Sequence, residues 1–182
     1  MTLFVNACVR KESRTKRLAD RLLSKLGGEI EEIRLWELDL PVVDEAFLNK
    51  RNAVVERENF EDPVCDLARQ FAKADTIVIA APYWDLSFPA SLKQYFELIN
   101  VLGITFKYTD DGMPVGLCRA EKLYYVTTAG GAFIPEEFGI GYVESLARNF
   151  YGIENVEYIK AYGLDILGAD TEGIMSEALA QI

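Results

Sequence analysis

Five short apolar runs alternate with segments of helical periodicity along this chain, and this alternation constrains the fold more than any other feature. The runs lie at residues 2–7, 29–35, 75–81, 122–128 and 155–164. The run at 75–81 is almost continuously apolar, as expected for a strand covered on both faces. Strands that alternate with helices form a parallel sheet with right-handed crossovers. The sequence therefore predicts a doubly wound α/β fold of five parallel strands with helices on both faces.

The predicted helices are marked by apolar spacing and by start and stop signals. The first carries its leucines at helical spacing and stops at Gly27-Gly28; later helices are expected from Asp62-Pro63, from Pro89, over 141–150 and over 172–180. A chain of 182 residues fits one domain, so we expect a single domain over residues 1–182.

Two segments fall outside the alternation. Residues 36–61 are charged and interrupted, which favours a long surface excursion with some helix. Residues 103–117 contain the turn signal Asp111-Gly112 between short β-like pieces, so a hairpin-like insert is expected there.

The run at 75–81 leads into an aromatic loop. Pro82, Tyr83, Trp84, Asp85 and Leu86 follow this strand directly. A loop at the carboxyl end of a parallel strand faces the crevice in which open α/β sheets bind their ligands. Two large aromatic side chains and a carboxylate there suggest a wall for a flat ligand. The alternative is that Tyr83 and Trp84 simply cover the core.

The loop after the first run has the composition of a phosphate site. It offers Arg10, Ser13, Arg14 and Thr15 beside the start of the first helix. Backbone N–H groups, the helix dipole, hydroxyl groups and cations all favour a phosphate at such a place. Neither GxxxxGK[ST] nor GxGxxG occurs, which argues against a nucleoside triphosphate or a Rossmann-bound dinucleotide. The alternative is that Ser13 merely caps the helix and the arginines are solvated.

A glycine-containing loop, Ala129-Gly130-Gly131-Ala132-Phe133, follows the fourth run and lets a ligand approach the backbone closely. The loops after the first, third and fourth strands are expected to converge at one edge of the sheet. Together they suit a phosphorylated planar molecule. Flavin mononucleotide (FMN) fits best, because the protein then needs to supply only stacking and hydrogen bonds.

Charge and cysteine content exclude several classes of function. The net charge is −10, which disfavours nonspecific binding to nucleic acids and to anionic membranes. Three widely spaced cysteines and no histidine argue against a disulfide scaffold and against common metal sites, so no metal is expected. The chain opens directly on a strand-like run, which favours a cytoplasmic protein with reduced thiols. Cys8 is expected to be a small packing residue.

Several ordered segments resemble one family. Residues 82–93, 103–109, 112–117 and 127–131 are similar to the flavodoxin-like quinone reductases and FMN-dependent azoreductases. The shared pattern is a proline, an aromatic residue, a proline-containing helix start with Leu-Lys, then Thr-Phe-x-Tyr-Thr, a Pro-x-Gly-Leu segment and two glycines. The resemblance covers most of the chain in the right order.

The resemblance implies a sheet order of 2-1-3-4-5 and an FMN-dependent oxidoreductase. Such an enzyme would pass two electrons from NADH or NADPH to a quinone or an azo compound, and it would be a homodimer. The implied cofactor-binding residues are Arg10, Ser13, Arg14, Thr15, Pro82, Tyr83, Trp84, Asp85, Leu86, Thr128, Ala129, Gly130 and Gly131. Phe106, Tyr108 and Phe133 would flank the substrate, with the Phe106/Tyr108 segment contributed by either subunit.

Departures from the family pattern leave alternatives open. Asp85 replaces the usual Asn, and its charge would disfavour an anionic reduced flavin. Ala129 replaces a larger polar residue, and without histidine the ring donor would have to be Tyr83, Tyr108 or a backbone amide. The other hypotheses are a one-electron carrier of the flavodoxin type, whose FMN site at a switch point is a standard example, and a module that keeps the fold without the cofactor.

Overall fold

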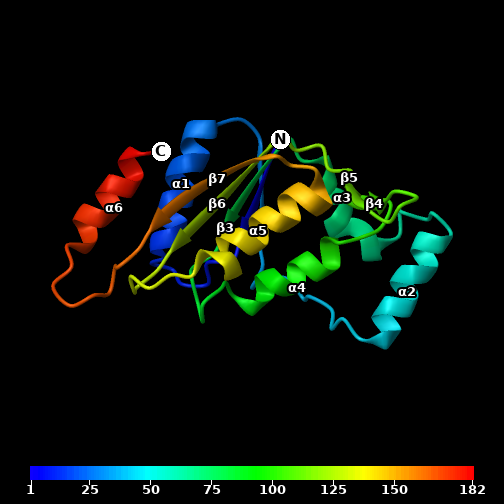
Figure 1. The fold of residues 1–182 in the computed structure, drawn as a ribbon, viewed down its shortest axis with the longest axis horizontal. Coiled ribbons are helices and arrows are strands. Elements are labelled where there is room, and N and C mark those ends of the chain that lie inside the picture. Colours follow the sequence, from blue (N-terminus) through cyan, green and yellow to red (C-terminus); the bar gives the residue numbers. More distant parts are fainter.

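The computed structural model describes all 182 residues and has a five-stranded parallel sheet at its centre (Figure 1). The strand order is β2-β1-β3-β6-β7, which confirms the predicted flavodoxin-like order. The strands are β1 (Thr2–Asn6), β2 (Ile30–Arg34), β3 (Thr76–Ala80), β6 (Lys122–Thr128) and β7 (Asn155–Ala161). In the register, Asn6 lies opposite both Arg34 and Ala80, so the carboxyl ends of the strands form one edge.

Helices cover both faces of the sheet, as predicted. One face packs against α1 (Arg14–Leu26) and α6 (Thr171–Ala180), and the other against α3 (Asp66–Lys73), α4 (Ala90–Ile99) and α5 (Ile140–Leu146). The chain continues from α5 through a π-helical segment, Ala147–Tyr151, which ends at the left-handed Gly152. No helix combines the length and apolar content needed to cross a bilayer.

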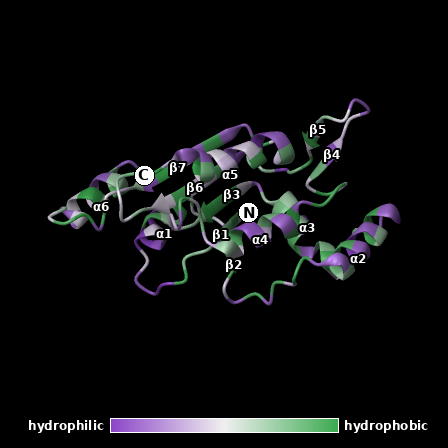
Figure 2. Ribbon diagram, turned by 60° about the horizontal axis from the view of Figure 1, so that its bottom comes forward, coloured by the Kyte–Doolittle hydropathy of each residue, from purple (hydrophilic) through white to green (hydrophobic).

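The predicted surface excursion is confirmed and contains α2 (Glu45–Glu56) at the edge of the molecule. Asp44 caps this helix by accepting a hydrogen bond from the N–H of Phe47, 2.8 Å long. Hydrophilic and hydrophobic residues alternate along α2 (Figure 2), and Val54 is its one buried residue. The helix therefore adds little to the core.

The predicted hairpin is formed by β4 (Phe106–Tyr108) and β5 (Pro114–Gly116). It precedes β6 in the chain and packs against the π-helical segment, with the rings of Phe106 and Phe150 centred 4.7 Å apart. It therefore lies near the amino ends of β6 and β7, beside α3 in Figure 1. This end of the sheet is opposite to the strand ends that carry the predicted cofactor loops.

The last strand is shorter than predicted. It ends at Ala161 rather than at residue 164, because residues 163–165 leave the sheet and bond to the loop after β6. The N–H groups of Gly163 and Asp165 donate to the carbonyls of Gly131 and Gly130, at 2.8 and 2.9 Å. This departure brings a segment into the site that the sequence assigned to a strand.

Candidate functional site

A cavity of about 370 Å³ opens at the carboxyl edge of the sheet, between the loops that follow β1, β3, β6 and β7. Its lining residues are Cys8, Val9, Arg10, Glu12, Ser13, Arg14, Thr15, Pro82, Tyr83, Trp84, Thr128, Ala129, Gly130, Leu164 and Asp165. Most of the cofactor-binding residues expected from the sequence are thus brought together. Asp85, Leu86 and Gly131 lie in the same loops but do not line the cavity.

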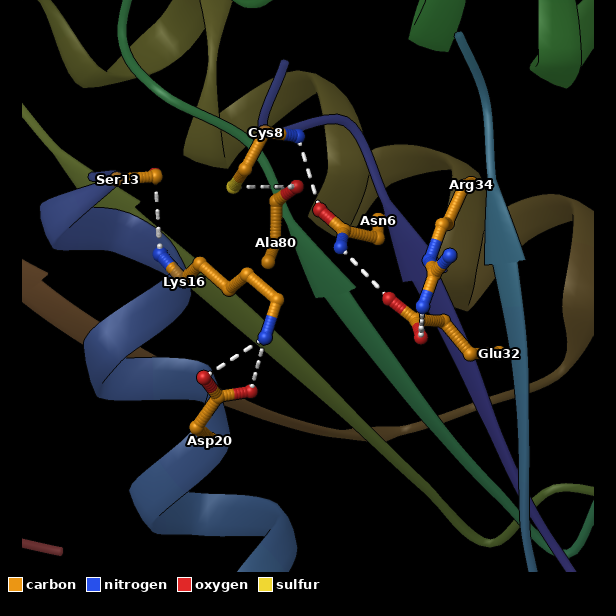
Figure 3. Close-up of polar contacts among 8 residues, drawn as sticks. All are labelled: Asn6, Cys8, Ser13, Lys16, Asp20, Glu32, Arg34 and Ala80. Carbon is orange, nitrogen blue, oxygen red and sulfur yellow. Dashed lines mark hydrogen bonds and ion pairs between the residues drawn. The ribbon is translucent and has the colours of Figure 1, made fainter. Parts of the chain in front are cut away.

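The start of α1 supplies unpaired donors to this cavity. Ser13 caps the helix, its Oγ accepting a 3.2 Å hydrogen bond from the N–H of Lys16 (Figure 3). The N–H groups of Ser13, Arg14 and Thr15 donate to no acceptor within the chain. Unpaired N–H groups at the positive end of a 13-residue helix are suited to an anion. Ser13 therefore caps the helix, as the alternative interpretation expected, and the unpaired N–H donors are present as well.

The loop between β1 and α1 is shaped by the buried Asn6. Its Oδ1 accepts a 2.9 Å hydrogen bond from the N–H of Cys8, and its Nδ2 donates to Glu32 at 2.8 Å (Figure 3). Burial acts to raise the pKa of Glu32, but hydrogen bonds from Asn6 and Arg34 outweigh it and hold that pKa below its usual value. The loop therefore leaves the sheet in a defined direction.

Cys8 is buried beneath the same loop. Its Sγ lies 3.6 Å from the carbonyl oxygen of Ala80, and burial raises the pKa of the thiol to about 11. A thiol with such a pKa is almost entirely protonated at neutral pH and is a poor nucleophile. This agrees with the expectation that Cys8 is a packing residue.

Thr15 and Thr128 join the helix to the sheet under the cavity. Their Oγ1 atoms are 2.7 Å apart, and both side chains are buried. One hydroxyl must donate to the other, so the pair keeps only one O–H group for any ligand. Both residues line the cavity, but much of their hydrogen-bonding capacity is used within the protein.

A strained two-residue turn ends the aromatic wall. Asp85 and Leu86 have positive φ angles of 50° and 67°, and Trp84 and Ser87 exchange backbone hydrogen bonds on either side of them. Leucine rarely adopts this conformation, which costs about 1–3 kcal/mol and is concentrated at functional sites. Both N–H groups of the turn lack an acceptor in the chain. Tyr83 and Trp84 line the cavity rather than only covering the core.

Two side-chain hydroxyls tie this wall to the segment before α5. The Tyr83 hydroxyl donates to the Pro135 carbonyl at 3.2 Å, and Ser87 Oγ donates to the Phe138 carbonyl at 2.6 Å. Burial, with a contribution from Glu137, raises the pKa of Tyr83, so its hydroxyl stays protonated at neutral pH. The wall and the neighbouring segment are therefore held together.

Asp165 is a cavity residue that the sequence did not reveal. Its Oδ1 accepts a 2.7 Å hydrogen bond from Arg14 Nη1 across the cavity. No motif marks this residue, since the apolar run that precedes it predicts a strand up to residue 164. Glu12 also lines the cavity, so its lining holds two carboxylates and two arginines, Arg10 and Arg14.

The three residues expected beside the substrate occupy different places. Phe133 is 81% exposed in the loop after β6, close in sequence to Gly130 and Gly131. Phe106 is 7% exposed and packs inside its own chain, and Tyr108 is 52% exposed on the hairpin. The chain does not bring the last two to its own cavity, because the hairpin lies at the opposite end of the sheet.

Fold and cavity together define a class: a flavodoxin-like α/β protein with unpaired N–H donors at a helix start beside an aromatic wall. The family model described as "Flavodoxin-like fold" matches residues 1–182. The chain belongs to this family.

Named relatives agree with this placement. An FMN-dependent NADH:quinone oxidoreductase from Coprothermobacter proteolyticus is 38% identical over 181 residues, which cover 94% of this chain and 89% of that protein. A second protein of that name, from Clostridium acetobutylicum, is 36% identical and covers 97% of this chain and 93% of its own length. A solved azoreductase from Bacillus anthracis superposes with a TM-score of 0.85 at 28% identity, covering 99% of this chain and 95% of that one.

Proposed function

We propose that the protein is an FMN-dependent oxidoreductase that takes electrons from NADH and reduces flat acceptors such as quinones or azo compounds. The observation that carries this proposal is the set of unpaired N–H groups at the start of α1, which face the same cavity as Tyr83 and Trp84. A phosphorylated planar ligand matches both ends of such a cavity. The names of the relatives supply the donor and the acceptor class.

The residues present fit FMN. The N–H groups of Ser13, Arg14 and Thr15, with the side chain of Arg10, would hold the phosphate. Pro82, Tyr83, Trp84, Asp85 and Leu86, together with Thr128, Ala129, Gly130 and Gly131, would hold the ring system, and Gly130 and Gly131 have unpaired N–H groups. When bound, FMN would supply the redox chemistry by accepting a hydride from NADH and passing two electrons to the acceptor.

The protein's own contribution is binding, orientation and exclusion of water. The Tyr83 hydroxyl is engaged with the Pro135 carbonyl, so it positions the wall and does not point freely at a ligand. Cys8 keeps its proton at neutral pH. We infer that the protons needed by the reduced acceptor come from solvent. The Asp85 carboxylate would oppose negative charge on a ligand beside it.

We further propose a homodimer in which Tyr108 of one copy faces the cavity of the other, next to Phe133. The hairpin exposes Tyr108, Met113, Val115 and Leu117 far from its own cavity, and such a group of exposed apolar side chains is typical of an interface. Phe106 would support Tyr108 from below, since their rings are centred 5.5 Å apart. Sedimentation equilibrium tests the dimer, and Tyr108→Ala should raise KM for the acceptor without changing FMN affinity.

The whole chain, residues 1–182, would act as one FMN-binding domain. We place it in the cytoplasm, because its three cysteines form no disulfide. Its charge of −10 supports small molecules as partners and argues against nucleic acids and membranes.

Absorbance spectroscopy tests the proposal. The purified protein is reconstituted with FMN and titrated anaerobically with NADH, then in a separate sample with NADPH, and finally with a benzoquinone. We expect the flavin bands to bleach in one two-electron stage with NADH and to return with the quinone. A bound flavin that neither nucleotide reduces would favour an electron carrier. A protein that binds no flavin would refute both functions.

A further inference from the structure

Asp165 is the acidic residue of the cavity that no motif explains. It stands in the segment after β7, and its side chain is two-thirds exposed, as is common for a carboxylate at a surface. Its single side-chain partner is Arg14, at 2.7 Å between Oδ1 and Nη1. Arg14 is in the first turn of α1, beside the unpaired N–H groups.

The geometry of the pair leaves Arg14 available to a ligand. A guanidinium has five N–H donors, and Asp165 engages one of its nitrogens. The remaining donors have no acceptor in the chain, so they can bind a phosphate while the ion pair persists. A long, flexible arginine that is already held in one place loses less conformational entropy on binding than a free one.

The chain is built to hold the Asp165 carboxylate in this place. The Asp165 N–H donates to the Gly130 carbonyl at 2.9 Å, which fixes the backbone. A Cβ atom on Gly130 would stand 2.4 Å from Asp165 Oδ2 and 3.1 Å from Asp165 Cβ, so a larger residue at position 130 would force the Asp165 side chain to shift. The sequence suggested that Gly130 allows close approach of a ligand; the structure shows that it also makes room for Asp165.

We propose that Asp165 is a positioning residue that holds the Arg14 guanidinium over the phosphate-binding end of the cavity and thereby selects phosphorylated flavin over riboflavin. This inference rests on the proposed function, since it concerns the phosphate of the proposed ligand. Asp165 also repels a phosphate, but water and salt screen this repulsion because the carboxylate is exposed. The direct contact with Arg14 therefore dominates.

Removing the charge should weaken FMN and spare riboflavin. Asp165→Asn keeps the size of the side chain and loses the ion pair. An exposed ion pair contributes up to about fivefold to an equilibrium, so we expect the Kd of FMN to rise about three- to fivefold and the Kd of riboflavin to stay within twofold. Glu121→Gln is the matched control: it makes the same charge change at an exposed residue directly before β6, whose side chain has no hydrogen bond or ion pair.

Fluorescence titration of each apo-protein with FMN and with riboflavin measures both affinities. Equal losses for the two flavins would assign Asp165 to loop packing and overturn the proposal. Tighter FMN binding by Asp165→Asn would overturn it as well, because repulsion would then dominate. If the wild-type protein binds neither flavin, the proposed function fails and this inference fails with it.

A second variant keeps the test independent of the charge change. Gly130→Ala should displace the carboxylate sterically, so we expect an FMN-specific loss beyond the loss shared with riboflavin, since Gly130 also lies beside the proposed ring site. In the Asp165→Ala background, Gly130→Ala should cause no further FMN-specific loss if this part of its effect acts through the carboxylate. An FMN-specific loss of the same size in that background would contradict the steric action through Asp165. Far-UV circular dichroism confirms folding of each variant.

Discussion

The buried hydroxyl pair between Thr15 and Thr128 allows a quantitative test of how the cavity floor is built. The two Oγ1 atoms lie 2.7 Å apart, and the side chains are 1% and 8% exposed. Thr15→Val replaces the hydroxyl by a methyl group of similar size and leaves Thr128 without its partner. An unpaired buried hydroxyl costs about 1–3 kcal/mol. We therefore expect Thr15→Val and Thr128→Val each to lower the free energy of unfolding by about 1–2 kcal/mol.

The double variant separates pairing from other effects. With both hydroxyls gone, no polar group is left unpaired, so the loss should be smaller than the sum of the two single losses by about 1 kcal/mol. Urea denaturation of the apo-protein, followed by circular dichroism, measures these differences. In thermal denaturation, the expected decrease in Tm for each single variant is about 2–8 °C. Thr76→Val is the control, because the Thr76 hydroxyl has no side-chain hydrogen bond in the structure.

Additive losses, or single losses below about 0.5 kcal/mol, would refute this reasoning. They would mean that the two hydroxyls do not bond to each other in solution and are both free for a ligand. Strong, independent losses of FMN affinity in both single variants would point the same way. The hydrogen-bonded pair of Thr15 and Thr128 leaves at most one O–H group free for a ligand.

Three further predictions follow from other contacts. Ser87→Ala removes the 2.6 Å hydrogen bond to the Phe138 carbonyl, which helps to hold the aromatic wall against the segment before α5. Because the wall would then be less firmly placed, KM for the acceptor should rise about two- to fivefold in steady-state assays, while FMN affinity stays the same. Burial raises the pKa of Cys8 from 9.0 to about 11, so the stability that the protonated thiol provides is present below pH 9 and is lost as the pH rises to 11. Between pH 9 and pH 11, the free energy of unfolding measured in urea should therefore fall by about 2 kcal/mol less in Cys8→Ala than in the wild-type protein. A Cβ on Gly116 would stand 2.0 Å from the backbone nitrogen of Gly152, so Gly116→Ala should destabilise the protein by at least about 2 kcal/mol, and an unchanged Tm would contradict this close approach.

The fold was predictable because local pattern and topology agree. Each apolar run is bounded by turn or helix signals, and the only way to cover a continuous apolar strand such as β3 is to place helices on both faces. The loops then meet at one edge by the register of the strands, which is why Ser13, Tyr83 and Gly130 line one cavity. These positions depend on the order of the elements and on the geometry of a parallel sheet, and the alternation of apolar runs and helices predicts both.

What escaped prediction depends on tertiary contacts without a periodic signal. The last strand ends at Ala161 because its continuation bonds to the loop after β6, and nothing in the apolar run 155–164 marks that point. Asp165 was missed for this reason. The position of Tyr108 was also beyond the sequence, because a turn signal predicts a hairpin but not the end of the sheet against which it packs.

The charge of the cavity shows why orientation matters more than net charge in this protein. The charged residues that line the cavity are Arg10, Glu12, Arg14 and Asp165, so the lining carries as many negative charges as positive ones, in a chain whose net charge is −10. A phosphate cannot be drawn there by excess positive charge. In the proposed function, a phosphate would be recognised by donors already aimed at it, namely the N–H groups at the start of α1 and an arginine held in place. Fixed donors lose little conformational entropy on binding, so the Asp165 carboxylate would favour phosphate binding by holding Arg14 in place.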